Sequence, residues 1–352
     1  MYTFHSKLRC SLHIPLLLVL LTLISLTSAL AMSTPLTVRV MDVGQGDSIL
    51  VQFPNGCNML VDAADRSHGR AVVDYLRSLK IKQIDILVAT HPHADHIGGM
   101  ADVLDAFTVG KVWDAGYNHG SEMQRQFLQR IKTAGIRYGT PISGFKEDVG
   151  AARIDVLAPV RLISDTNSDA NNNSLVLRIS YGKVSFLLTG DMETEERATI
   201  QSFPSSTVLK VAHHGSSNGT DAQFLRAVSP SIAVISLAAQ NDYGHPHPTT
   251  LAALKTSGAK VYTTPESGTV VVTTDGDTVS VRTAKESVAA PASAAANPPS
   301  VSGRQQYIGN LNSHVFHLPS CSSLPAEKNR TYFTSRSGAV SQGYRPCGRC
   351  KP

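Results

Sequence analysis

Short runs of alternating apolar residues and longer stretches of helical periodicity follow one another along this chain. Residues 36–53 and 57–63 carry the alternation of antiparallel strands, and Asn55-Gly56 between them is a hairpin signal. Residues 70–81, RAVVDYLRSLKI, place apolar side chains at helical spacing, whereas the continuous apolar run at 84–90 is typical of a buried strand. This part of the chain therefore predicts a mixture of strands and helices.

The mixture of strands and helices continues toward the C-terminus. Another helix begins within residues 98–107, and strand-like apolar runs lie at 175–179, 184–189, 208–212 and 232–236. We predict mixed sheets covered by helices, which is an α/β fold with αββα sandwich architecture.

The N-terminus has the composition of a targeting segment. Lys7 and Arg9 precede an apolar run at 14–26, and Ala29-Leu30-Ala31 supplies the small-x-small pattern of a cleavage site. We expect residues 1–31 to be a cleaved signal peptide. The alternative is an uncleaved membrane anchor, because the apolar segment is just long enough to cross a bilayer. In both cases we expect the rest of the chain to be secreted or extracytoplasmic, with no membrane domain of its own.

A change in composition divides the remaining chain. Residues 284–303 are rich in Ala, Pro and Ser without periodicity, which predicts a linker between a large domain at 32–283 and a small one at 304–352. The whole chain has a net charge of +5, yet the small domain holds seven Lys or Arg against one acid, Glu327. The basic charge is therefore concentrated in the tail.

Residue types that bind metals are densest directly after the apolar run at 84–90. The stretch ATHPHADHIGG holds His91, His93, Asp95 and His96 within six residues. Core packing explains it poorly, because His and Asp are costly to bury without partners. Imidazole and carboxylate ligands without thiolate suit catalytic zinc, manganese or iron, and a strand end followed by a turn can direct two ligands to each of two cations. The alternative is a chance histidine-rich turn.

This stretch resembles the His-x-His-x-Asp-His signature of the metallo-β-lactamase superfamily. Six motifs in order also resemble the extracytoplasmic hydrolase domain of ComEC-type competence proteins, which are involved in DNA uptake; they are MDVGQGDSIL, MLVDAAD, IDILVATHPHADHIGG, NNNSLVLRISYGKVSFLLTGD, KVAHHGS and GHPHP. The resemblance covers about Leu36 to Arg282. It implies the αββα sandwich and a metal-dependent hydrolase domain at 32–283.

The resemblance also implies roles for the residues of the signature. His91 and His93 would bind a first metal ion, and Asp95 and His96 would bind a second. Asp191, which closes the apolar strand VSFLLTGD, resembles the carboxylate that bridges both ions.

Other residues of the matched motifs have expected supporting or binding roles. Asp62 resembles a buried aspartate that orients ligand histidines by a hydrogen bond. His213 and His214 form a doublet at a strand end, and we expect His214 to bind the first metal. We expect His247 to bind the second metal or contact substrate, and His245 to be an orienting or exposed residue.

For each of four further polar residues, the sequence leaves two interpretations open. Asp42 and Asp47, with Gln45 between them, either support the ligands from behind or only shape a bulged hairpin. Asn173 and Ser174 either donate to a substrate phosphate or cap a turn.

The tail contains a second predicted metal site. His317 lies four residues before Cys321, and Cys347 and Cys350 form a Cys-x-x-Cys pair, a tetrahedral zinc arrangement, with a disulfide as the alternative. Residues from about 307 to 352 resemble the metal-binding domain of Ada-type DNA-repair proteins, which implies a small α+β module with one structural zinc. His317 stands where that family has its methyl-accepting cysteine, so we do not expect methyl transfer.

Together these features predict an exported nuclease or phosphodiesterase that acts on extracellular DNA through a hydroxide activated by two divalent metal ions, zinc first and manganese as the alternative. Asp95, Asp191 and His214 are the expected catalytic residues. The basic tail is expected to bind DNA phosphates; the alternative is a solvated basic surface. The alternative functions are hydrolysis of another ester or amide, such as a cell-wall phosphocholine ester, a lactone or a β-lactam, and zinc-dependent DNA binding without catalysis.

Overall fold

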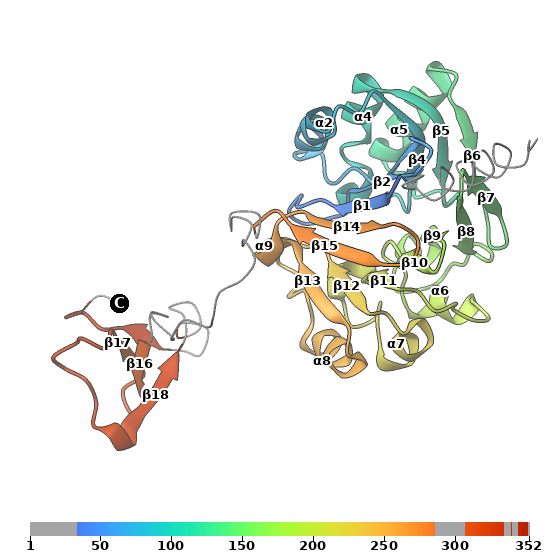
Figure 1. Ribbon diagram of the computed structural model, residues 1–352. Helices are drawn as coiled ribbons and strands as arrows, with labels where there is room; N and C mark the ends of the chain where they lie inside the picture. Colours follow the sequence, from blue (N-terminus) through green and yellow to red (C-terminus); the bar gives the residue numbers. More distant parts are fainter. Residues whose placement is uncertain (1–33, 286–306, 334–338, 340–343, 351–352) are drawn as a thin grey trace, which may run out of the picture. The chain divides into compact units, whose positions relative to one another are not determined.

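The computed structural model describes residues 34–285, 307–333, 339 and 344–350, and the chain divides into two compact units, Met1–Ala290 and Pro291–Pro352 (Figure 1). The predicted signal segment and nearly all of the predicted linker lie outside the described residues. Within the described ranges, no helix combines the length and the apolar character needed to cross a membrane.

The larger unit begins with an eight-stranded mixed sheet in the order β15-β14-β1-β2-β3-β4-β5-β6. The first three strands pair antiparallel, as predicted, and Gly56 takes a φ of +88° in the turn between β2 and β3. From β3 to β6 the pairing is parallel. The strands are β1 (Leu36–Val40), β2 (Ile49–Gln52), β3 (Asn58–Val61), β4 (Gln83–Ala89), β5 (Thr108–Asp114), β6 (Arg137–Gly139), β14 (Val270–Thr274) and β15 (Val279–Thr283).

A seven-stranded sheet in the order β13-β12-β11-β10-β9-β8-β7 forms the second layer. Strands β10 to β13 run parallel to one another, and β7 to β10 pair antiparallel. The strands are β7 (Lys146–Val149), β8 (Ala152–Ala158), β9 (Val176–Tyr181), β10 (Val184–Leu188), β11 (Val208–Lys210), β12 (Ile232–Ile235) and β13 (Lys260–Thr263).

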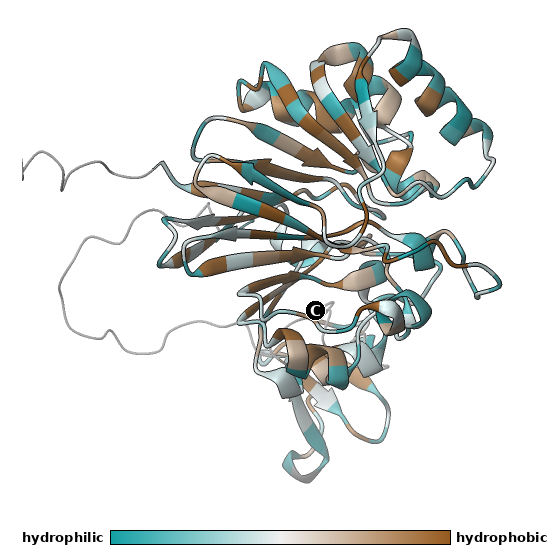
Figure 2. Ribbon diagram, turned by 90° about the vertical axis from the view of Figure 1, so that its right-hand side faces the viewer, coloured by the Kyte–Doolittle hydropathy of each residue, from teal (hydrophilic) through white to brown (hydrophobic). Residues whose placement is uncertain are grey.

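The two sheets pack face to face and helices cover their outer faces, so the predicted αββα sandwich is confirmed (Figures 1 and 2). Val38 and Val51 of one sheet meet Ile179 and Phe186 of the other in a central core. One further apolar core lies beneath the helices on each side of the sandwich. The helices are α2 (Gly69–Ser78), α3 (Ala94–Ile97), α4 (Met100–Ala106), α5 (Glu122–Thr133), α6 (Thr194–Thr199), α7 (Ala222–Val228), α8 (Pro248–Ser257) and α9 (Thr264–Ser267).

The helix predicted at 70–81 ends three residues early. Val72 and Leu76 of α2 are buried at the expected spacing, and Ile81 beyond the helix packs into the same core. Lys80 takes a φ of +61°, which ends the helical path. Because the apolar pattern continues through this turn, the pattern alone overestimates the length of the helix.

The smaller unit contains a four-stranded sheet in the order β18-β16-β17-β19. Its apolar core consists of Phe316, Phe333, Ala339 and Tyr344, with Tyr307 packed against it. The strands are β16 (Tyr307–Asn310), β17 (Val315–His317), β18 (Arg330–Phe333) and β19 (Arg345–Pro346), and η4 (Glu327–Asn329) is a short 3-10 turn.

Candidate active site

The candidate site forms where strands of both sheets end. His91 and His93 follow the end of β4, Asp191 follows β10, and the doublet His213-His214 follows β11 in the 3-10 turn η3 (Ala212–Gly215). Parallel strands place their carboxyl ends at one edge of a sheet, and β10 and β11 are parallel. Residues far apart in the sequence therefore meet at this edge.

Four side chains form a compact group, with ligand atoms that all lie within 4.8 Å of one another: Asp95, His96, Asp191 and His214. The distance from His96 Nε2 to Asp191 Oδ1 is 3.3 Å, and His214 Nε2 lies 3.3 Å from Asp95 Oδ2. Four ligands about 2.0 Å from a tetrahedral ion stand about 3.3 Å apart. These two distances match the spacing between neighbouring ligands of one metal ion.

Several polar atoms of this group are buried without hydrogen-bond partners among the described residues. They are His96 Nε2, His214 Nε2 and Asp191 Oδ1. Buried polar atoms in proteins are nearly always paired, and imidazole nitrogen with carboxylate oxygen is a donor set that divalent cations accept. The residues therefore fit a divalent cation.

His91 and His93 form a second, looser group beside Asp191. His91 Nε2 lies 3.1 Å from His93 Nδ1 and 3.8 Å from Asp191 Oδ2. His214 Nε2 lies 3.4 Å from the same oxygen. The Asp191 carboxylate thus contacts both groups. His214, which we expected with the first metal, lies with Asp95 and His96, the ligands expected for the second.

Hydrogen bonds fix the direction of the two buried imidazoles. Asp62 is fully buried, and its Oδ2 accepts from His96 Nδ1 at 2.8 Å and from the Thr90 hydroxyl at 2.7 Å. His214 Nδ1 donates to the Ser236 carbonyl at 2.8 Å. Because Nδ1 donates in each ring, each Nε2 is left to face the cluster, which is the arrangement that metal-binding histidines show.

A buried ion pair that the sequence analysis missed lies behind His214. Lys210 Nζ contacts Asp47 Oδ2 at 2.8 Å, and both side chains are 1% exposed. Asp47 Oδ1 lies 3.7 Å from His214 Nδ1. Asp42, by contrast, is exposed, and only its backbone N–H is bonded, to Thr269. The only sequence signal for the pair was a lysine within the apolar run VLKVA.

The loop before Asp47 closes tightly on the metal-binding turn. A side chain at Gly46, where φ is +117°, would place its Cβ 2.1 Å from the Asp95 carbonyl oxygen. Asp47 N–H donates to the same carbonyl, and the Gln45 amide oxygen accepts from Ala238 N–H. Glycine is therefore required at position 46.

Glu193, another residue that sequence reasoning missed, contacts His213. His213 Nδ1 lies 3.1 Å from Glu193 Oε1, and the carboxylate also accepts from the amides of Asn171 and Asn172. His213 and His214 have φ values of 47° and 52°, a left-handed conformation that non-glycine residues adopt at a cost. The polar contacts hold the doublet in this strained turn.

Asn173 and Ser174 have structural partners. The Asn173 side chain accepts from Ile163 N–H and donates to the Ile163 and Asp169 carbonyls. Ser174 Oγ accepts from Asp191 N–H at 3.2 Å. The Asn173 contacts are those of a turn-forming residue, whereas Ser174 holds the backbone of Asp191.

A cavity of about 480 Å³ opens over the cluster; its lining is Gln45, His93, Ala94, Asp95, Ser168, Asn171, Asp191, Glu193, His213, His214, Tyr243 and His245. His245 is in this lining and His247 is not. His247 precedes α8, and its Nδ1 accepts from Ser217 N–H at 2.9 Å. Of the two histidines, His245 therefore lies closer to the cluster.

Opposite charges set the protonation of the buried groups. Burial would raise the pKa of Asp191, but His214 and His96 outweigh it and hold the pKa well below its usual value. Burial would lower the pKa of His214, but Asp191 raises it to about 10. Burial, with His213 and His214 nearby, lowers the pKa of His245 to about 4. The centre thus holds ionised carboxylates beside a neutral His245.

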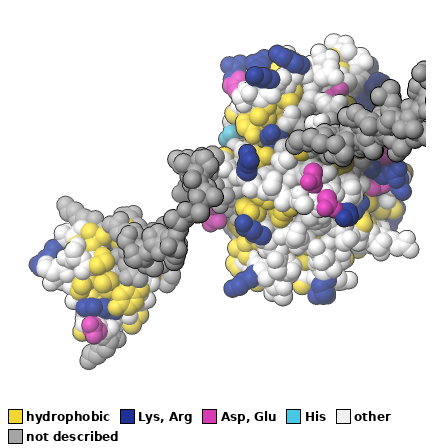
Figure 3. Space-filling model, in the orientation of Figure 1, with side chains coloured by type: hydrophobic (Ala, Val, Ile, Leu, Met, Phe, Trp, Pro, Cys, Tyr) yellow, Lys and Arg dark blue, Asp and Glu magenta, His cyan; other side chains and the backbone are white. Residues whose placement is uncertain are grey.

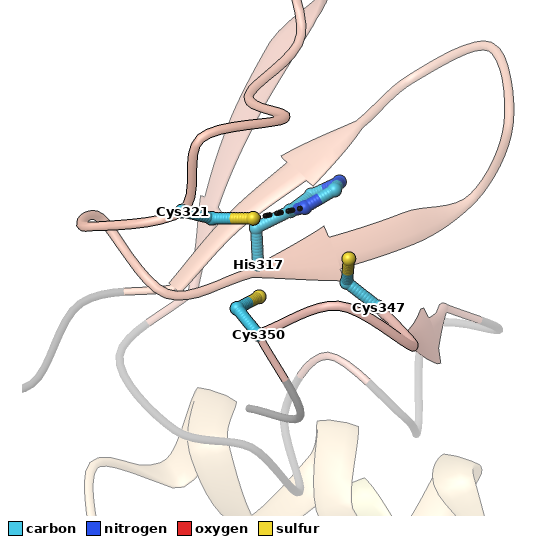
Figure 4. Close-up of side chains that lie close together, drawn as sticks. All are labelled: His317, Cys321, Cys347 and Cys350. Carbon is cyan, nitrogen blue, oxygen red and sulfur yellow. Dashed lines mark hydrogen bonds between the residues drawn. The ribbon is translucent and has the colours of Figure 1, made fainter.

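The predicted tail ligands also meet (Figure 4): His317, Cys321, Cys347 and Cys350 have ligand atoms within 4.8 Å of one another. Backbone N–H groups of Leu318 and Arg349 donate to the sulfurs of Cys350 and Cys347 at 3.4 Å. Bonds from the backbone of residues 350 and 349 lower the pKa of the Cys347 thiol. All four cysteines in the described ranges are free thiols, and the tail set fits a zinc ion.

Comparisons with known proteins agree with this geometry. Residues 41–239 match the family model of the metallo-beta-lactamase superfamily, and residues 293–352 match that of the metal binding domain of Ada. The chain is 30% identical over 253 residues to ComE operon protein 3 of Bacillus subtilis, which is 66% of this chain and 32% of that protein. It is 31% identical over 236 residues to competence protein ComA of Neisseria gonorrhoeae, which is 66% of this chain and 31% of that protein.

The chain thus spans about a third of the length of these curated relatives. Among solved structures, the metallo-beta-lactamase fold protein YhfI of Bacillus subtilis is 15% identical, with a TM-score of 0.47 over 68% of this chain and 100% of that one.

Proposed function

This chain belongs to the metallo-beta-lactamase superfamily, and on that premise we propose that it is an exported nuclease or phosphodiesterase that cleaves extracellular DNA. The observation that carries metal-dependent hydrolysis is the group Asp95, His96, Asp191 and His214, with three buried atoms that have no other partner in the described residues. Two divalent cations held by this group together with His91 and His93 would generate a nucleophile from water at neutral pH and offset charge on the phosphate oxygens.

The residues of the site have separate roles in holding the cations and in orienting the ligands. Asp191 contacts residues of both ligand groups and would hold the cations together with them. Asp62 holds His96, and the Ser236 carbonyl holds His214, so that both rings face the centre. Such fixed orientation keeps the ligands from having to reorganise during the reaction.

The proposal of DNA as substrate is supported by one relative and by the basic charge of the tail. One relative, which is 31% identical, is named competence protein ComA. Among the described residues that line the cavity, none is Lys or Arg, whereas Asp95, Asp191 and Glu193 are acidic. A phosphate would therefore be held by the bound cations and by neutral groups.

Surfaces outside the cavity would then have to bind the DNA. Figure 3 shows Lys and Arg scattered over one face of the larger unit rather than gathered in one patch. The tail has seven basic residues against one acid from residue 304 onward. We propose that the tail binds DNA phosphates and so raises the concentration of substrate near the active site.

A second candidate is the hydrolysis of another ester, such as a phosphocholine ester or a lactone. The specific observation in its favour is the same lining of the cavity, since a substrate with little negative charge needs no Lys or Arg. Export is proposed for both candidates, on the targeting pattern of residues 1–31.

The test is digestion of end-labelled single- and double-stranded DNA by the purified chain with zinc or manganese. We expect cleavage that a chelator abolishes and that Asp191→Asn lowers by orders of magnitude, with His247→Ala as the matched control outside the cavity. Intact DNA from a preparation shown to bind metal would contradict the nuclease proposal and favour the second candidate.

A further inference from the structure

Tyr243 stands at the rim of the cavity above the metal-binding cluster. Its side chain is 64% exposed, the most exposed large hydrophobic side chain in the described ranges, and it lines the cavity. A single exposed hydrophobic residue is ordinary on a protein surface. The significance of Tyr243 comes from how its ring is held and from what lies beside it.

The Tyr243 ring is stacked on a ring that faces the cluster. The planes of Tyr243 and His245 are inclined by only 22°, with centroids 5.6 Å apart. His245 in turn lies 5.3 Å from His213 and 6.4 Å from His214, again between ring centroids. Two aromatic rings thus lead from the metal-binding group to the rim of the cavity.

The loop that carries these rings is fixed by one side chain. Asn241 Oδ1 accepts from His245 N–H at 2.9 Å, and Asn241 Nδ2 donates to the carbonyls of His245 and Ala238. These hydrogen bonds, called the Asn241 clamp below, connect the two ends of the segment 238–245, which carries Tyr243. The ring is therefore held in place before any substrate arrives, which reduces the entropy lost on binding.

The chemistry of the cavity determines what such a ring would recognise. The described lining offers no Lys or Arg for the sugar-phosphate backbone, which leaves the bases as the other part of a nucleic acid that it can contact. Every nucleobase presents a π-face to an aromatic ring, but only when it is unpaired and unstacked.

We propose that Tyr243 and His245 form a stacking subsite for an unpaired nucleobase next to the phosphate at the metal-binding cluster. The subsite directs the enzyme to single-stranded DNA or to single-stranded ends of a duplex. This inference rests on the proposed nuclease function and names the form of its substrate.

The experiment compares kcat/KM for a single-stranded oligonucleotide with kcat/KM for an oligonucleotide of the same length whose bases are replaced by abasic sites. It uses the full chain with zinc or manganese, and the variants Tyr243→Ala and Tyr243→Phe. Stacking on one aromatic ring corresponds to a preference of about 5- to 150-fold for the base-bearing strand. We expect Tyr243→Ala to lose most of this preference and Tyr243→Phe, which keeps the ring, to retain it.

Each result decides between the two proposals. Equal preference in wild type and Tyr243→Ala would overturn the stacking subsite while leaving the nuclease function intact. Failure of the wild type to cleave either strand would overturn the nuclease function and the subsite with it. Because the Tyr243 side chain is largely exposed, its truncation is expected to leave the fold intact, which circular dichroism checks.

Discussion

The buried ion pair of Lys210 with Asp47, which lies behind His214, gives the most direct test of how the active site is stabilised. The ammonium group of Lys210 lies 2.8 Å from Asp47, and both side chains are 1% exposed. At an effective dielectric constant of about 20, two unit charges at this distance attract by about 6 kcal/mol. Removing one partner of a buried pair usually costs about 3–5 kcal/mol, because the other charge stays buried without compensation.

We therefore expect Lys210→Met to lower the free energy of unfolding of the larger unit by about 3–5 kcal/mol. Urea titration measures this through the fluorescence of Trp113, the single tryptophan of the chain, which is 4% exposed in the central core. A chelator is present throughout, so that metal binding does not add to the measured stability.

The matched control is the double variant Lys210→Met/Asp47→Asn. It removes both charges and should recover a large part of the stability that the single variant loses. A loss below about 1 kcal/mol in Lys210→Met, or a double variant that loses the sum of the two single losses, would refute the buried ion pair.

Three other predictions follow from the described contacts. Asp62→Asn should weaken metal binding about 10- to 100-fold, because His96 loses the partner that directs its Nε2; an unchanged affinity in competition with a chelator would contradict this. Burial raises the pKa of Glu196 well above its usual value, so the folded state keeps a proton that the unfolded chain releases. Stability should be full below the ordinary Glu pKa of about 4.3 and fall as pH rises toward the raised pKa. Urea titrations across this range should show the fall in the wild type and its absence in Glu196→Gln. Cys347→Ala should unfold the smaller unit and weaken DNA binding while sparing hydrolysis of a small phosphodiester, and equal loss of both activities would argue against separate units.

The parts of the site that lie close together in the sequence could be predicted from it. His91, His93, Asp95 and His96 lie within one turn of chain after a buried strand, and their spacing alone indicated a metal site. The strands were visible because their apolar runs are short and bounded by polar turns, and the sandwich was predicted partly from the resemblance to the metallo-β-lactamase superfamily.

The parts that the sequence missed depend on contacts between distant segments. His214 lies with Asp95 and His96 because a left-handed turn after β11 points its ring across the sheet edge. Which of His245 and His247 faces the cavity depends on the Asn241 clamp and on Ser217, which no spacing reveals. Lys210 ends a strand of one sheet, and its partner at residue 47 lies just before a strand of the other. The only sign of this pair in the sequence was a lysine within an apolar run.

The measurement that tests the central claim most directly is the metal content of wild type, His214→Ala and His247→Ala, determined with the rate of DNA cleavage on the same samples. The account predicts that His214→Ala loses metal from the larger unit together with cleavage, whereas His247→Ala keeps both. Retention of metal and cleavage in His214→Ala, or their loss in His247→Ala instead, would contradict the assignment of the metal centre.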